Sequence, residues 1–305
     1  AVNGKNNEAL THVNKIKALN FLAIYLYFLL YYLMQLEDHV GDICRKTRIQ
    51  SGVSLKDAAY EAGLSEEDME QWEDQGEIQA SVKLEALAAF LGLNPEKLLL
   101  IAGGWVPRQV DLNQWSKLSV ITTAQSFDVN SYLIWDPETR NAAIFDTGWF
   151  ADDIFSLVKK EQLMVQYLFI THMHGDHVAA LGEIRKRWSQ VHVLSNNDGA
   201  PAKNRIKANQ LVEIGRLKVE PRFTPGHAED GVTYVVEGWG QGVPPVAIAG
   251  DAIFAGSMGK DFSTDNIARL KVREEILTLP QDSLICPGHG PLTTVSEELE
   301  YNPFF

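Results

Sequence analysis

The sequence predicts an α/β fold, a four-layer αββα sandwich that is preceded by a small all-α domain. Two observations support this prediction. In the second part of the chain, apolar strand-like runs are followed by a helical pattern, further strands and a final helix, which is the order that two sheets between helices need. In the first part, short helical patterns with capping residues follow one another from Leu36 to Gly104.

The composition is that of a globular, acidic protein. The chain has 305 residues, 45% of them hydrophobic, and a mean hydropathy of -0.13, so it can bury a sizeable core and hold more than one domain. The net charge of -13 disfavours broad contact with nucleic acid or with an anionic membrane. Two cysteines, Cys44 and Cys286, provide no disulfide framework, which favours a reducing, cytoplasmic setting.

Residues 1–33 are not expected to belong to the fold. The run from Ala18 to Met34 is nearly all apolar and stands at the short limit for a membrane span. Because Met34 opens an ordinary sequence, we expect an extension upstream of the natural start. The alternatives are a membrane anchor and a partner-binding helix, and membrane contact is expected only if residues 18–34 are a real anchor.

Residues 34–108 are predicted to form the helical domain. Serine or asparagine precedes each helical pattern, and an aspartate follows two of the serines at the spacing of a capping box. Pro95 suits the first position of a helix. The expected caps are Ser54 with Asp57, Ser65 with Asp68, Ser81, and Asn94 before Pro95.

This domain resembles a helix-turn-helix of the phage-repressor type, with Gly63 in the turn and residues 65–75 as the would-be recognition helix. A DNA reader needs lysine or arginine there, yet that helix carries six acidic residues. From Leu36 to Arg108 there are 14 acidic and 7 basic residues. We therefore expect an accessory domain for homodimer or partner contact or for lid duty, and we do not expect nucleic-acid binding.

Residues 109–115 are predicted to be a linker, and residues 116–305 the α/β domain. Its strands are rich in branched and aromatic residues, and its helices show apolar residues on one face. The expected strands are 118–123, 131–135, 142–145, 167–170, 191–194, 211–214, 217–223, 232–236 and 284–286, and the expected helices are 151–161, 178–188 and 266–279.

The stretch from Thr171 to His177 has the pattern His-x-His-x-Asp-His on the loop between a predicted strand and a predicted helix. His172 and His174 are two residues apart, so on an extended segment both leave on the same face and can hold one ion. Asp176 and His177, beyond the turn at Gly175, point elsewhere and suit a second ion.

Three further candidate ligands stand downstream, each at the end of an apolar run and beside a glycine that lets the backbone approach a metal closely. Five histidines and two aspartates suit zinc, iron or manganese and argue against a soft thiolate site. The downstream positions are His227 after Gly226, Asp251 after Gly250, and His289 between Gly288 and Gly290.

This set resembles the metallo-β-lactamase superfamily of binuclear hydrolases over residues 116–305. Within it, residues 250–259, 287–294 and 302–304 resemble the glyoxalase II-like (hydroxyacylglutathione hydrolase-like) branch. The resemblance implies a four-layer αββα metallo-β-lactamase sandwich. It also implies two divalent metal ions per chain, which we expect to be zinc, with iron or manganese as the alternatives.

By the same resemblance, Asp251 bridges the two ions, and a metal-bridging hydroxide is the nucleophile. Asp176 and Asp251 thereby take part in catalysis. The turn at residues 146–148 resembles a structural aspartate turn that supports the ligands. The implied ligand sets are His172, His174 and His227 for one ion, and Asp176, His177 and His289 for the other.

Lys260 corresponds to a basic residue that binds the carboxylate of the thiol carrier in glyoxalase II proteins, so a small-molecule thioester is the expected substrate. A persulfide dioxygenase with one iron is an alternative, and the complete second ligand set counts against it. A lactonase or phosphodiesterase would use the same metals. The non-enzyme alternative is a helix-turn-helix regulator with a metal-binding sensor domain.

Overall fold

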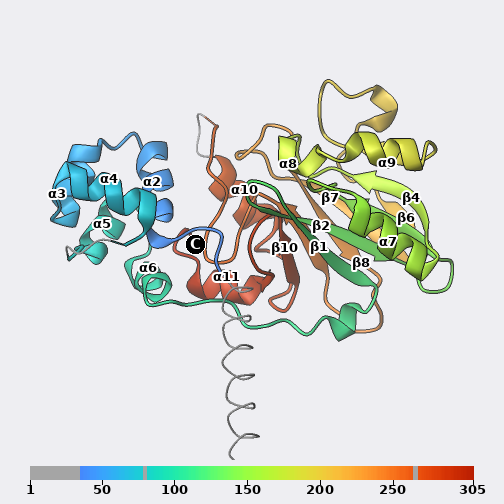
Figure 1. The fold of residues 1–305 in the computed structure, drawn as a ribbon. Coiled ribbons are helices and arrows are strands. Elements are labelled where there is room, and N and C mark those ends of the chain that lie inside the picture. Colours follow the sequence, from blue (N-terminus) through green and yellow to red (C-terminus); the bar gives the residue numbers. More distant parts are fainter. Residues whose placement is uncertain (1–34, 78–80, 264–266) are drawn as a thin grey trace, which may run out of the picture. The chain divides into compact units, whose positions relative to one another are not determined.

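The structure is a computed structural model that describes residues 35–77, 81–263 and 267–305 (Figure 1). Residues 36–305 form one compact unit, and their predicted subdivision at residues 108 and 116 stays a prediction. The predictions for residues 1–33 lie outside the described residues. Within residues 35–77, 81–263 and 267–305, no helix is both long and apolar enough to cross a membrane.

The helical region confirms the caps expected at three helices. The hydroxyls of Ser54 and Ser65 each accept from a backbone amide three residues on at 3.1 Å, and the side chain of Asn94 does the same at 3.1 Å. The helices are α2 (Val40–Gln50), α3 (Leu55–Ala62), α4 (Glu66–Gln75), α5 (Leu84–Phe90) and α6 (Pro95–Ala102).

The cap predicted at Ser81 is wrong, because α5 begins three residues later, with Lys83 at its N-cap position. The amide of Lys83 donates to the carbonyl of Ala62 at 2.9 Å. This long-range bond holds the segment before α5 against the end of α3, so the first helical turn starts only at Leu84.

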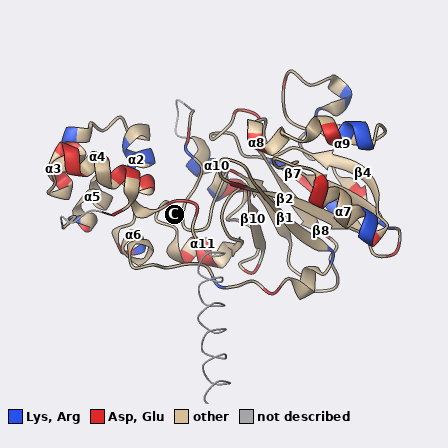
Figure 2. Cartoon of the chain, in the orientation of Figure 1, with Lys and Arg blue, Asp and Glu red and all other residues tan. Residues whose placement is uncertain are grey.

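The acidic residues of α4 have roles within the helical region itself (Figure 2). Glu66, Glu67 and Asp68 lie in its first turn, where negative charge interacts favourably with the helix dipole. Glu73 is buried and accepts two hydrogen bonds from the Arg48 guanidinium, at 2.6 and 2.7 Å. The resemblance of this region to a helix-turn-helix remains a prediction.

The first sheet of the described residues has five strands in the order β1-β2-β3-β4-β5. The first three strands pair antiparallel, and β3, β4 and β5 run parallel. Helix α7 (Asp152–Glu161) connects β3 to β4, and α9 (Leu181–Arg187) precedes β5. The strands are β1 (Leu118–Ala124), β2 (Asp128–Trp135), β3 (Asn141–Phe145), β4 (Met164–Phe169) and β5 (His192–Leu194).

The second sheet of the described residues has six strands in the order β11-β10-β9-β8-β7-β6. Only β9 and β10 are parallel neighbours, and α10 (Ile267–Glu275) lies between them in the chain. Strands β9 and β11 were not among the predicted ones. The strands are β6 (Val212–Ile214), β7 (Leu217–Phe223), β8 (Val232–Glu237), β9 (Val246–Gly250), β10 (Leu284–Pro287) and β11 (Thr293–Thr294), followed by α11 (Val295–Tyr301).

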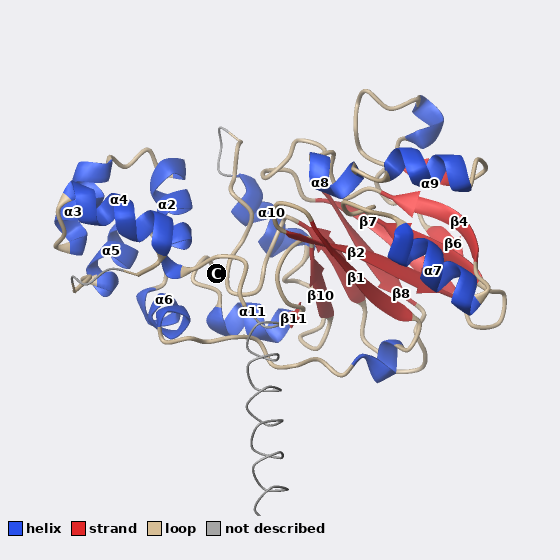
Figure 3. Cartoon of the chain, in the orientation of Figure 1, coloured by secondary structure: helices blue, strands red, loops and turns tan. Residues whose placement is uncertain are grey.

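The predicted αββα layering is confirmed (Figure 3). Ile154 of α7 and Ile184 of α9 share an apolar cluster with the outer face of the first sheet. Tyr132 and Tyr234 lie in the cluster between the two sheets. Val272 of α10 packs in the cluster on the far side of the second sheet.

The helical region is joined to this last cluster, because Ile43, Leu87 and Leu98 belong to the same set of buried side chains as Val272. The amide of Asn94 also donates to the carbonyl of Pro303 at 2.8 Å. The helices from α2 to α6 therefore share a core with the second sheet and its helices.

Glu298 ties α11 to the loop that follows β9. Its buried carboxyl accepts hydrogen bonds from the amide of Gly256 at 3.1 Å and from Asn302 at 2.7 Å. Burial raises the pKa of this carboxyl from its usual 4.5 to about 8, although those hydrogen bonds act in the opposite direction.

We therefore expect the free energy of unfolding to fall as pH rises from about 4.5 to about 8, because the folded protein keeps the Glu298 proton there while the unfolded chain releases it. Glu298→Gln should flatten this slope, as measured by urea unfolding at several pH values. Glu300→Gln, at an exposed position of the same helix, is the control and should keep the slope of the parent. An unchanged slope in Glu298→Gln would contradict the assignment.

Candidate metal centre

The structure brings all seven predicted ligand residues together. They lie on loops that follow strands of both sheets, so the stacking of the sheets sets their positions. His172 and His174 follow β4, Asp176 and His177 lie in the short helix α8 (Gly175–Val178), His227 lies between β7 and β8, Asp251 follows β9, and His289 follows β10.

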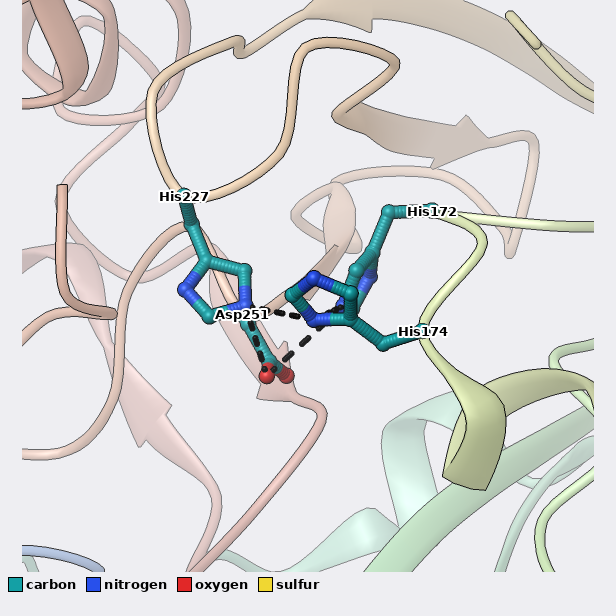
Figure 4. A group of neighbouring side chains, drawn as sticks. All are labelled: His172, His174, His227 and Asp251. Carbon is teal, nitrogen blue, oxygen red and sulfur yellow. Dashed lines mark hydrogen bonds and ion pairs between the residues drawn. The ribbon is translucent and has the colours of Figure 1, made fainter. Parts of the chain in front are cut away.

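One group of four side chains converges around Asp251 (Figure 4). Nδ1 of His174 lies 3.0 Å from Nε2 of His172 and 3.0 Å from Nε2 of His227. The Asp251 oxygen Oδ2 is 3.3 Å from Nε2 of His227 and 3.8 Å from that of His172. These potential ligand atoms lie within 4.8 Å of one another, which is close enough for one ion to reach all of them.

A second group consists of Asp176, His177 and His289. The Asp176 oxygen Oδ2 is 3.3 Å from Nε2 of His177 and 3.2 Å from Nε2 of His289. All three residues are buried. Asp251 connects this group to the first, because its Oδ1 lies 3.2 Å from Nε2 of His177 and its Oδ2 lies 3.4 Å from Nε2 of His289.

The electrostatics of the site reflect this crowding of carboxylates and imidazoles. Burial would raise the pKa of Asp251, but His177 and His289 hold it well below its usual value. Burial would likewise lower the pKa of His177 and His289. At His177 the carboxylates of Asp251 and Asp146 outweigh this effect of burial and raise the pKa to about 10. At His289 the carboxylates of Asp176 and Asp251 outweigh it and raise the pKa to about 11.

Three imidazoles contact an oxygen atom through Nδ1, the ring nitrogen that is not directed at the metal centre. Nδ1 of His177 lies 2.7 Å from the Asp146 carboxylate, that of His227 lies 3.1 Å from the Lys260 carbonyl, and that of His289 lies 2.6 Å from the Asp128 carbonyl. An oxygen acceptor at Nδ1 fixes the proton there and leaves Nε2 free as a ligand atom. The expected support from Asp146 is thus present in the geometry.

Two glycines allow the backbone to approach the site. A Cβ atom at Gly288 would lie 2.1 Å from the Asp251 carboxylate and 2.7 Å from the His177 ring. A Cβ atom at Gly259 would lie 2.0 Å from the Asp251 carbonyl and 2.8 Å from the His227 ring. Any other residue at either position would displace ligand side chains or their backbone.

The donor set and its unpaired atoms fit a metal. Nε2 of His177 and Oδ1 of Asp251 are buried and lie 3.2 Å apart, yet within the described residues neither atom forms a hydrogen bond. A buried polar atom without a partner is costly, and a cation between these atoms removes that cost. Imidazole nitrogen with carboxylate oxygen is a set that zinc, iron and manganese accept.

Two residues orient ligands through their backbone carbonyls, and the sequence predicted this role for neither. One is Asp128, and the other is Lys260, for which the sequence predicted only substrate binding. Every residue has a carbonyl, so residue type gives no signal for this role. Thr171, whose hydroxyl lies 3.1 Å from Nδ1 of His172, was named only as part of the motif. Its hydroxyl and amide also donate to the Asp146 carboxylate, at 2.7 and 2.8 Å.

The αββα sandwich and the two His/Asp groups define an α/β protein with candidate metal sites at the strand ends. The chain belongs to the metallo-beta-lactamase superfamily, whose family model matches residues 125–289. It is 31% identical to "Probable metallo-hydrolase YqgX" of Bacillus subtilis, across 53% of this chain and 85% of that protein.

Two further relatives have different names. The human "Persulfide dioxygenase ETHE1, mitochondrial" is 33% identical across 57% of this chain and 70% of its own. The "Hydroxyacylglutathione hydrolase GloC" of Haemophilus influenzae is 27% identical across 60% of this chain and 96% of its own. Among solved structures, the BLEG-1 B3 metallo-beta-lactamase aligns with a TM-score of 0.53 and 25% identity, over 61% of this chain and 98% of that one.

Asp146→Asn should weaken zinc binding by about 10- to 100-fold, because the neutral amide no longer holds the His177 proton at Nδ1. Competition with a chromophoric chelator measures this affinity. Asp136→Asn is the matched control, since Asp136 is also buried and accepts backbone hydrogen bonds but contacts no ligand histidine in the described residues. Equal zinc affinities for the two variants would refute the role of Asp146.

Proposed function

We propose that the chain is a binuclear metal-dependent hydrolase. The single observation that supports this most is the position of Asp251, whose two oxygens lie within 3.2–3.8 Å of histidines from both groups. In this proposal Asp251 bridges the two ions. His172, His174 and His227 hold one ion, and Asp176, His177 and His289 hold the other.

Two bound divalent cations would lower the pKa of water and polarise the carbonyl that it attacks. The chain itself supplies the negative charge of Asp176 and Asp251 that offsets cation repulsion. Three of the histidines, His177, His227 and His289, are oriented by oxygen atoms at Nδ1, which leaves their Nε2 atoms available as ligands. A cysteine nucleophile is disfavoured, because Cys286 is buried and burial raises the pKa of its thiol well above the usual value.

We further propose a thioester as the substrate, as in the name of the Haemophilus influenzae relative. A thiolate is a good leaving group that a metal can also stabilise, so no dedicated general acid is required. The Lys260 ammonium lies 5.1 Å from the centre of the Phe262 ring, and that ring lies 5.7 Å from the His227 ring. A cation beside an aromatic ring that adjoins the ligand His227 suits the anion of a thiol carrier.

The name of the human relative favours persulfide dioxygenase chemistry as the second candidate. For this chemistry we expect one iron per chain. The presence of Asp176, His177 and His289 as a buried second group supports two ions instead. Metal content with oxygen uptake separates the two candidates, since one iron per chain and oxygen consumption with a persulfide would replace the hydrolase proposal. Lactonase and phosphodiesterase activities belong in the same substrate screen.

Replacing His289 by Ala should reduce the metal content from two ions per chain toward one, because the second group loses one of its three protein ligands. Elemental analysis of protein purified under metal-replete conditions measures this. His192→Ala is the control, since His192 lies on β5 outside both groups and should keep two ions. A parent protein that never exceeds one equivalent would disprove the binuclear assignment.

Lys260→Ala should raise KM for a glutathione-type thioester by about tenfold and change kcat less, because a charge-assisted contact made outside the reacting bond is lost. Steady-state kinetics provide the test. Lys271→Ala is the control, because Lys271 is paired with Glu274 at 2.8 Å and lies outside the metal groups. Unchanged KM in Lys260→Ala, or far better hydrolysis of lactones or phosphodiesters, would leave only the binuclear hydrolase.

A further inference from the structure

A cavity of about 230 Å³ lies between helix α2 and the loop that follows Asp251. Lys46 and Gln50 of α2 line one wall, and Lys260 and Arg269 line the other. Met258 and Phe304 add apolar surface. The helical region therefore forms one wall of a cavity. The opposite wall includes Lys260, whose carbonyl contacts the candidate ligand His227.

The lining is cationic in a chain whose net charge is -13. Lys46 is already neutralised by Asp38, and Asp261 accepts the amides of Ser263 and Ala268. Neither Lys260 nor Arg269 forms an ion pair with any of the described residues.

Among the described residues, Arg269 donates only to neutral carbonyls, those of Phe304 and Gly92. Burial lowers the pKa of the Arg269 guanidinium, and the positive charge of the nearby Arg273 lowers it further. An anion is the ligand that such a cavity favours.

The cavity is one backbone segment away from the metal ligands. Gly259 packs against the His227 ring, and the Lys260 carbonyl accepts from Nδ1 of His227 at 3.1 Å. Phe262 is 61% exposed, and the centre of its ring lies 5.7 Å from that of His227 and 5.1 Å from the Lys260 ammonium. The Phe262 ring therefore adjoins both a cation that lines the cavity and a candidate metal ligand.

Helix α2 is fixed against this loop. The Lys46 ammonium donates to the carbonyl of Met258 at 2.7 Å and lies 5.6 Å from the centre of the Phe254 ring. The Phe254 ring in turn lies 5.9 Å from the His289 ring. Through these contacts, the position of α2 is fixed relative to the loop and to the candidate ligand His289.

We propose that the cavity between α2 and the loop at 258–261 binds the anionic end of the thiol carrier, so that the helical region is one wall of the substrate site. This proposal rests on the proposed thioester hydrolysis and extends it. The shared ligand chemistry is an anion at the far end of a thiol carrier. A carboxylate would come from a glutathione-type peptide, and a phosphate from a coenzyme A-type carrier.

Charge substitution at Gln50 tests this, because Gln50 lines the cavity and its side chain makes, within the part of the chain that the structure describes, a single hydrogen bond of 3.4 Å to the Ser263 carbonyl. Titration calorimetry with the full-length protein would use two thioethers that cannot be hydrolysed, S-methylglutathione and S-methyl-coenzyme A. Gln50→Glu should weaken binding of the preferred thioether about tenfold, and Gln50→Lys should tighten it. Opposite effects at one position exclude misfolding as the cause.

Gln71→Glu is the matched control, since it makes the same charge change on the exposed face of α4, outside the cavity. It should bind both thioethers as the parent does. In kinetics, an uncharged N-acetylcysteamine thioester should show the same KM with Gln50→Glu and with the parent. The thioether that responds to Gln50 identifies carboxylate or phosphate as the anion.

The proposal is overturned if Gln50→Glu and Gln71→Glu bind the thioethers equally, or if neither thioether binds. Its failure is distinguishable from failure of the proposed function. If the protein hydrolyses thioesters but the Gln50 substitutions do not change thioether binding, only the proposal that the cavity binds the anion is refuted. Gln50-dependent thioether binding by a protein that hydrolyses no thioester would support the anion site and refute the activity.

Discussion

The arrangement of the site depends on one buried carboxylate, that of Asp251. An ionised carboxylate without compensation is very costly in a protein interior, and here its compensation comes from imidazoles on other loops. His172 and His177 belong to the first sheet's side of the sandwich, whereas His227 and His289 follow strands of the second. The carboxylate can be accommodated only when both sheets are stacked, so the site and the fold form together.

The orientation of the ligands depends on segments that lie far from them in the sequence. Asp146, Asp128 and Lys260 each present an oxygen to an imidazole Nδ1, and they come from three different segments of the chain. Because the Lys260 carbonyl holds His227 while its ammonium lies over Phe262, one residue joins the metal centre to the proposed carrier cavity. Small shifts of this loop would affect both.

The helical region has the capping pattern of an independent domain, yet its buried side chains share a cluster with α10 and α11. Its acidic residues stabilise the start of α4 and pair with Arg48, which gives them a structural purpose apart from any partner. Together with the contact of Lys46 to Met258, this favours a role for α2 beside the loop that follows Asp251. Nucleic-acid binding by this region remains disfavoured by its charge.

The sequence by itself determined the features that depend on local spacing. The His-x-His-x-Asp-His run predicted the grouping of ligands, the alternating strands and helices predicted the sandwich, and Ser54 and Ser65 predicted helix starts. Local spacing failed at Ser81, where a long-range bond from Lys83 to Ala62 sets the start of α5. Only the tertiary structure decided which oxygen atoms contact Nδ1 of the histidines, and that α2 lies across the cavity from Lys260. Backbone carbonyls carry no residue signature, and a cavity between distant segments exists only after both have packed.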